Sequence, residues 1–100
     1  MIVDRRVYHV KLGCAEALVN LLKEAIEGYT AYTRSYRIYT PKISSYDVVV
    51  VEWEFKDLQE MEAVWDAWNA SPASSTFNEK VYEFIKEGGS GEVWNLVAHR

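Results

Sequence analysis

The segment Tyr46–Phe55 joins a run of valines to alternating acidic residues, and it constrains the fold more than any other part of the chain. In a strand, successive side chains point to opposite faces. One alternating set is apolar throughout and consists of Val49, Val51, Trp53 and Phe55. The other set begins apolar and becomes acidic at Glu52 and Glu54. The middle of this strand must therefore be covered on both sides.

Helical periodicity is clearest after Gly13, which ends a first predicted strand over Ile2–Leu12. Apolar residues then recur at spacings of three and four, as one face of a helix requires. This stripe consists of Leu18, Leu21, Leu22, Ala25, Ile26 and Tyr29. Gly28 lies where the helix should end, because glycine tolerates the backbone conformation that closes a helix.

A second helical region is predicted to begin at Asp57, with Glu60 completing a capping box. Its apolar stripe consists of Leu58, Met61, Val64, Trp65 and Trp68. Ser71-Pro72 interrupts this region, because the residue before a proline resists the helical conformation.

Beyond this break, Thr76 and Glu79 form a second candidate capping box. Phe77, Val81, Phe84 and Ile85 then recur at helical spacing. The sequence therefore predicts a helix from about Thr76 to the glycine-rich segment Gly88–Gly91, which ends it in a loop.

Further strands are predicted over Thr33–Thr40, which Pro41 ends, and over Val93–Val97. The first of these should form a hairpin with the valine-rich strand. The resulting order is β-α-β-β-α-β, with the second helical region split in two. The sequence thus predicts one α+β domain over residues 1–100, with a ferredoxin-like four-stranded antiparallel sheet and helices on one face.

Helices on one face leave the other face of the sheet without a cover. Burying one valine- or tyrosine-sized side chain contributes about 1.5–3 kcal/mol, so two such faces gain by associating. We therefore expect a homodimer, with a ligand cavity between the two sheets. Glu52 and Glu54 are assigned to this side because ionised carboxylates under packed helices are costly. Arg6 is a candidate partner for them, and separate solvated charges are the alternative.

Composition narrows the classes of partner. The net charge is −4 and the basic residues form no continuous track, which argues against nucleic acid. No apolar run is long enough to span a bilayer, and the N-terminus does not resemble a signal peptide. The single cysteine excludes an internal disulfide framework, and a cytoplasmic location is expected. Histidine and cysteine show no metal-ligand spacing, so neither metal nor cofactor is expected.

Candidate site residues fall into two groups. The possible acid–base residues are His9, Glu52 and Glu54, and the alternative for the two glutamates is a solvated strand end. The possible ligand-binding residues are Arg6, Tyr8, Tyr36, Trp53 and Trp94, for which core packing is the alternative, most strongly for Trp53. Cys14 at the start of the first helix could have an activated thiol, but a small residue at a helix entry is the favoured interpretation.

Two segments resemble the NIPSNAP family. Arg6-Val7-Tyr8 followed by Lys11-Leu12-Gly13 is similar to its opening strand and turn. The stretch Val49–Asp57 resembles its valine-rich strand, and Ser71-Pro72 resembles its break after the second helix. This resemblance implies a dimeric α+β barrel, a superfamily that also contains antibiotic-biosynthesis monooxygenases, haem-degrading enzymes and lactone isomerases.

Fold alone does not imply a reaction. The expected function is therefore small-molecule binding by a homodimer, with a small aromatic ligand as the candidate occupant. The alternative is a cofactor-free monooxygenase or isomerase that acts on an aromatic or polyketide-like substrate.

Overall fold

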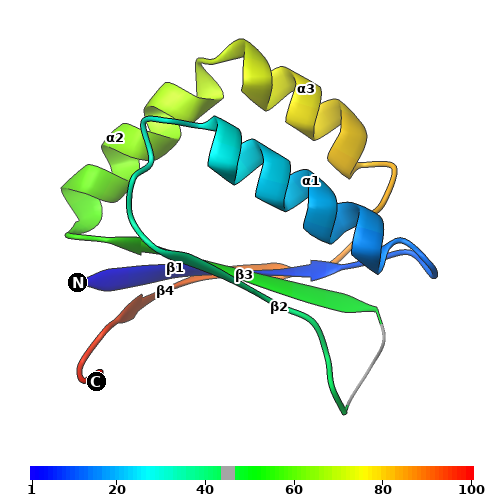
Figure 1. The fold of residues 1–100 in the computed structure, drawn as a ribbon, viewed down its shortest axis with the longest axis horizontal. Helices are drawn as coiled ribbons and strands as arrows, with labels where there is room; N and C mark the ends of the chain where they lie inside the picture. The colour runs from blue at the N-terminus through cyan, green and yellow to red at the C-terminus, as the bar shows by residue number, and fades with distance from the viewer. Residues whose placement is uncertain (44–46) are drawn as a thin grey trace.

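The computed structural model describes residues 1–43 and 47–100. Its elements are β1 (Ile2–His9), α1 (Ala15–Gly28), β2 (Tyr36–Tyr39), β3 (Val48–Phe55), α2 (Leu58–Asn69), α3 (Pro72–Val81) and β4 (Ser90–Asn95). Within the described ranges, four strands form one antiparallel sheet in the order β2-β3-β1-β4. The helices lie together on one side of it (Figure 1). The predicted α+β, ferredoxin-like class is confirmed, whereas Tyr46 lies outside the described residues.

The strand register assigns each side chain to a face. Asp4 pairs with Trp53 on the helix side of the sheet, and Arg5 pairs with Glu52 on the opposite side. We call this opposite side the open face. Glu54 also belongs to it, opposite Val3. Both glutamates therefore lie on the face without helices, as the alternation in the valine-rich strand predicts.

The core lies between β3 and the helices. Its fully buried side chains include Phe55, Leu18, Leu22, Val10, Val49 and Val51. Phe55, Val49 and Val51 belong to the apolar alternate set of β3, Leu18 and Leu22 to the predicted stripe of α1, and Val10 follows β1. Each contributes about 1.5–3 kcal/mol when removed from water, so this layer fixes α1 to the sheet.

The helix starts agree only in part with the sequence. Asp57 caps α2, because its carboxylate accepts a hydrogen bond of 2.9 Å from the backbone N–H of Glu60. The predicted start of α3 at Thr76 is wrong. Ser71 caps this helix by accepting from the N–H of Ser74, and Pro72 occupies its first turn. Proline fits there because its φ is already helical and it has no N–H to leave unpaired.

Several predicted ends also differ. The helix α3 ends at Val81, and Ile85 beyond it bridges to Val10 instead of continuing the helix. The strand β1 ends at His9, β2 begins at Tyr36, and β4 is Ser90–Asn95 instead of Val93–Val97. The residues that pair with β1 determine where β4 begins and ends. The sequence of β4 alone does not show which residues pair.

The third helix stands away from the sheet. In Figure 1, α3 lies above α1, and it packs mainly against α1 and α2. Side chains do not completely fill the space between the helices and the sheet. Among the described residues, no helix combines the length and the apolar character needed to cross a membrane.

Candidate ligand-binding cavity

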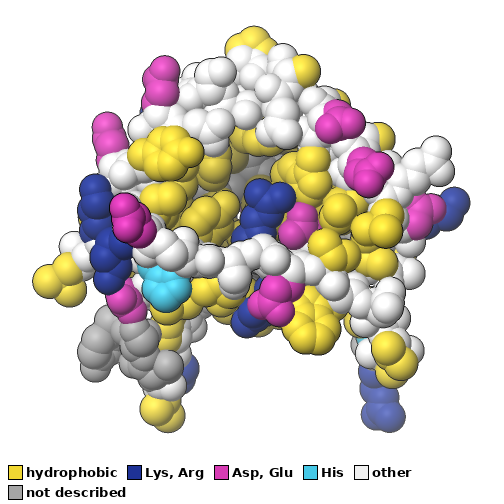
Figure 2. All heavy atoms as spheres, turned by 180° about the vertical axis from the view of Figure 1, so that it is seen from behind, with side chains coloured by type: hydrophobic (Ala, Val, Ile, Leu, Met, Phe, Trp, Pro, Cys, Tyr) yellow, Lys and Arg dark blue, Asp and Glu magenta, His cyan; other side chains and the backbone are white. Residues whose placement is uncertain are grey.

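A cavity of about 320 Å³ lies between the helices and the sheet. It is lined by β1, β3 and all three helices, and its volume falls at the lower end of the range typical of small-molecule sites. Its aromatic lining consists of Tyr8, Tyr29, Tyr32, Trp53, Trp65, Trp68, Phe77 and Tyr82. Figure 2 shows hydrophobic side chains gathered around a hollow on this side of the molecule. Such walls favour a flat, largely apolar ligand.

Arg6 brings a positive charge to this apolar space. Its guanidinium carbon lies 4.7 Å from the ring centroid of Trp65 and 5.5 Å from that of Trp53. The two indoles meet almost at right angles, with centroids 5.0 Å apart. Two cation–π contacts therefore hold the guanidinium in the corner that they form. Among the described lining residues, Arg6 is the one charged side chain.

Asp4 provides the nearest counter-charge. It is 4% exposed, and its Oδ2 accepts a hydrogen bond of 2.8 Å from the Trp65 indole N–H. The same oxygen lies 3.4 Å from an Arg6 nitrogen. The short bond therefore fixes the carboxylate to α2, while the longer contact neutralises the arginine only in part.

Tyr8 follows Arg6 on the same face of β1 and is held as a neutral hydroxyl. Burial raises the pKa of Tyr8, and the charge and hydrogen bond of Arg6 only partly offset this effect. At neutral pH its phenol can donate a hydrogen bond to a ligand.

Two other tyrosine hydroxyls at the cavity are occupied by the protein. Tyr29 donates to the carbonyl of Val64 over 3.3 Å. Tyr32 donates to the carbonyl of Ser35 and accepts from the N–H of Glu54. Burial raises the pKa of Tyr32 to about 12. These two side chains are therefore structural, whereas Arg6 and Tyr8 are available for recognition.

An outer groove of about 520 Å³ adjoins the cavity at the β4 edge. It shares Arg6, Tyr8, Trp65 and Ile85 with the cavity, and the segment 88–93 forms part of its wall. Gly89 has a φ of +94°, and a Cβ there would lie 2.5 Å from the carbonyl oxygen of Val7. Glycine at this position therefore lets the loop approach β1 closely.

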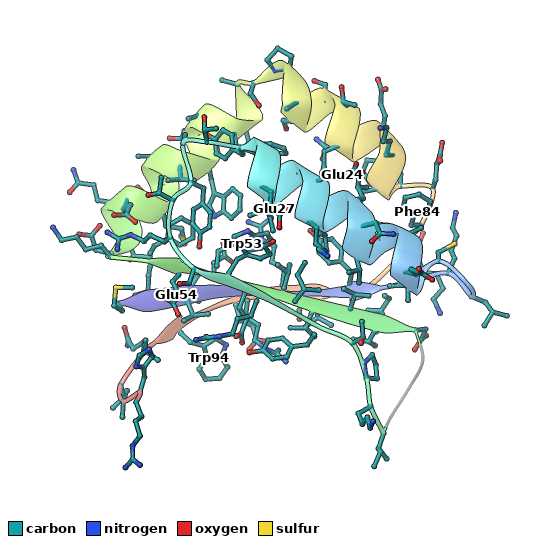
Figure 3. All side chains as sticks on the ribbon, viewed as in Figure 1. Glu24, Glu27, Trp53, Glu54, Phe84 and Trp94 are labelled. Atoms are coloured by element: carbon teal, nitrogen blue, oxygen red, sulfur yellow. The ribbon has the colours of Figure 1, made fainter. Side chains whose placement is uncertain are left out.

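The predicted ligand-binding residues are only partly brought together. Arg6, Tyr8 and Trp53 line the cavity. Tyr36 lies on the helix side too, but its hydroxyl donates to Glu27 over 2.9 Å, away from the cavity lining. Trp94 is 56% exposed and points away from the helices, on the side of the sheet opposite Trp53 (Figure 3).

The predicted acid–base residues lie on the open face, and none of them lines the cavity. His9 pairs with Val48 there, beside the glutamate pairs already described. The predicted pairing of Arg6 with Glu52 or Glu54 is wrong. Arg5 lies 3.6 Å from Glu52, and Arg37 lies 3.5 Å from Glu54. The register is the reason, because it places Arg6 on the opposite side of the sheet from both glutamates.

The expected cavity between two sheets stays a prediction. The cavity described in this chain lies under the helices. Sequence reasoning missed the contributions of Asp4, Trp65, Trp68 and Phe77. The aromatic residues were assigned to helix stripes, and a stripe does not show which of its members face an unfilled space. In the described part of the chain, no three His, Cys, Asp or Glu residues gather into a group that could hold a metal ion.

Comparisons with known proteins agree with this architecture. The family model for NIPSNAP matches residues 3–90. An uncharacterized NIPSNAP domain protein from Burkholderia xenovorans is 20% identical, with a TM-score of 0.81 over 98% of this chain and 96% of that one. A NIPSNAP family protein with unknown function from Agrobacterium tumefaciens is 19% identical, with a TM-score of 0.79 over 93% and 85%.

An antibiotic biosynthesis monooxygenase is also similar, at 14% identity and a TM-score of 0.72 over 98% of this chain and 100% of that one. At these identities the likeness shows a shared fold. Among the curated proteins, none matches the chain.

Proposed function

This chain belongs to the NIPSNAP family, and we propose from its geometry that it is a homodimeric small-molecule-binding protein. The proposal rests on the geometry because the similar NIPSNAP proteins include ones of unknown function. The observation that carries the proposal is the aromatic cavity of about 320 Å³ with Arg6 at its edge. Arg6, the one charged side chain in the described lining, and the Tyr8 hydroxyl lie two residues apart on β1, and a few placed polar groups of this kind can orient a ligand in an apolar cavity.

The open face supports the homodimer. Along β3 it presents Val48 and Val50, and at its edges it exposes Tyr39 and Trp94. Two copies related by a two-fold axis would cover these side chains with the same patch. Its charges do not prevent this, because Arg5 lies 3.5 Å from Glu92 as well as near Glu52, and Arg37 pairs with Glu54. Each copy therefore brings largely compensated charge to the interface.

Light scattering during size-exclusion chromatography tests the dimer. The expected mass is twice the 11.6 kDa of one chain. Val50→Asp should shift the mass to that of the monomer, because it adds a carboxylate to the middle of the open face. Glu24→Asp is the matched control, since Glu24 is exposed on α1 (Figure 3). A single-chain mass for the unmodified protein at micromolar concentration would contradict the dimer.

Ligand binding is tested separately by native mass spectrometry and by a thermal-shift screen with aromatic acids, quinols, lactones and haem. We expect planar aromatic compounds to raise the melting temperature. Ala25→Phe should abolish these shifts, because Ala25 lines the cavity and a larger side chain would fill it. A complete lack of hits, or hits that are unchanged in Ala25→Phe, would contradict a binding role for this cavity.

A cofactor-free monooxygenase or isomerase is the second candidate. It is favoured by the structural likeness to an antibiotic biosynthesis monooxygenase and by the neutral Tyr8 hydroxyl at an aromatic cavity. Oxygen uptake with quinols, or product formation from a lactone, would be the evidence for it. Tyr8→Phe should then lower turnover more than it lowers binding. Binding without turnover would favour the first candidate.

A further inference from the structure

We propose that the cavity selects planar aromatic acids, with the rings against its aromatic walls and the carboxylate on Arg6. This inference rests on the proposed binding function and specifies its ligand class. It depends on three features of the structure: the sign of the charge in the cavity, the donors that the guanidinium retains, and the position of Asp4.

The charge in the cavity is opposite to that of the chain. The chain carries a net charge of −4, yet the charged side chain in the described lining is the cation Arg6. The indoles of Trp53 and Trp65 shield part of the guanidinium from water, so its charge is screened less than that of a fully exposed side chain. The cavity therefore favours an anion over a neutral ligand of the same shape, and it disfavours a cation.

Arg6 keeps most of its hydrogen-bonding capacity. A guanidinium has five N–H donors in a planar fork that matches a carboxylate. In the described structure its contacts are the long one to Asp4, the interaction with Tyr8 and the two indole faces. Its side chain is 42% exposed. The indoles thus orient the fork without using its N–H groups, and these remain available to a ligand.

Asp4 sets the strength of this interaction. Its hydrogen bond to Trp65 holds the carboxylate 3.4 Å from Arg6, where it lowers the positive potential without closing a two-pronged ion pair. A ligand carboxylate must bind despite this neighbouring negative charge. Replacing Asp4 by asparagine retains an oxygen that can accept from Trp65 and removes the repulsion. This substitution should therefore strengthen the binding of anions.

The position of Arg6 also gives the ligand a direction. Arg6 lies where the cavity meets the outer groove at the β4 edge. Ile26, Trp68 and Phe77 line the cavity but not the groove. A ligand with one charged end would therefore place its rings inside the cavity and its carboxylate at the mouth.

Calorimetric titration with 2-naphthoate and 2-naphthamide at pH 7 tests the proposal, because the two probes share a shape and differ in charge. We expect the unmodified protein to bind 2-naphthoate at least about tenfold more tightly. Arg6→Gln should remove this preference and leave the affinity for 2-naphthamide within about twofold. Asp4→Asn should increase the affinity for 2-naphthoate severalfold, again without a matching change for 2-naphthamide.

Arg6→Lys is the second variant if Arg6→Gln does not fold, as judged by circular dichroism. It keeps the charge but not the fork, so we expect an intermediate preference. Equal affinity for the two probes in the unmodified protein, or an unchanged preference in both Arg6 variants, would overturn the proposal while leaving a binding cavity in place. If no planar aromatic compound bound, charged or neutral, the proposed function itself would fail.

Discussion

The hydrogen bond between Trp65 and Asp4 joins α2 to β1 at the edge of the cavity, and its removal is the most direct test of how the cavity is built. Trp65→Phe keeps an aromatic ring in place but deletes the indole N–H that donates to the buried carboxylate over 2.8 Å. Trp68→Phe is the matched control. Trp68 lies on the same helix and lines the same cavity, but its ring contacts are with Tyr29 and Phe77.

The expected difference follows from the burial of Asp4. A hydrogen bond to a charged group contributes about 1.5–3 kcal/mol, and a buried acceptor that loses its donor keeps its desolvation penalty. With the Asp4 side chain 6% exposed, water cannot easily replace the lost donor. Both variants exchange an indole for a phenyl ring, so the loss of ring area largely cancels, and the contact of Trp65 with Arg6 adds to the expected difference. We therefore expect Trp65→Phe to lower the free energy of unfolding by about 2 kcal/mol more than Trp68→Phe does.

Urea denaturation of both variants, followed by circular dichroism at one protein concentration, measures this difference. The concentration must be fixed because dimerisation would contribute to the apparent stability. A difference of about 2 kcal/mol corresponds to about 8–16 °C in melting temperature for a domain of this size. Equal losses in the two variants would refute the reasoning, because the hydrogen bond would then contribute nothing beyond ring packing.

Three other substitutions test local features. Asp57→Ala should cost about 0.5–2 kcal/mol in urea denaturation, because the N–H of Glu60 loses its cap; an unchanged midpoint would contradict this role. Gly89→Ala should destabilise by about 1–3 kcal/mol, since its Cβ would meet the Val7 carbonyl at a positive φ; a melting temperature equal to that of the unmodified protein would count against it. Burial raises the pKa of Tyr32 from 10.0 to about 12, so its contribution to stability is complete below pH 10 and is lost as the pH rises to 12. Tyr32→Phe should therefore reduce the loss of stability between these pH values, and an identical pH profile would exclude this source.

The sequence was sufficient to predict the fold because the patterns of its elements are strong. Apolar stripes with helical spacing in α1 and α2, and alternation in β3, are both local signals. Ser71-Pro72 correctly predicts the interruption, but the capping box at Thr76 predicts the helix start too late. A serine cap followed by proline competes with the capping box at Thr76, and the earlier signal determines the start of α3.

The candidate site was predictable only in part, because it depends on register and on helix placement. Alternation alone places Arg6 and Tyr8 on one face, but it does not show whether Arg5 or Arg6 faces Glu52. A shift of one residue between β1 and β3 would exchange the two arginines. The cavity itself exists because α3 packs on other helices and not closely on the sheet. No pattern within α3 reveals this arrangement.

The strands β1 and β3 serve both proposed roles through their alternation. In β1, Arg6 lines the cavity and Asp4 lines the adjoining groove, while Arg5 between them faces the open side. In β3, Trp53 forms part of the cavity while Glu52 belongs to the opposite face. The two surfaces therefore share a backbone but not side chains. A substitution on the open face can change assembly without removing a cavity contact. Such a substitution can alter ligand binding only by shifting the strands.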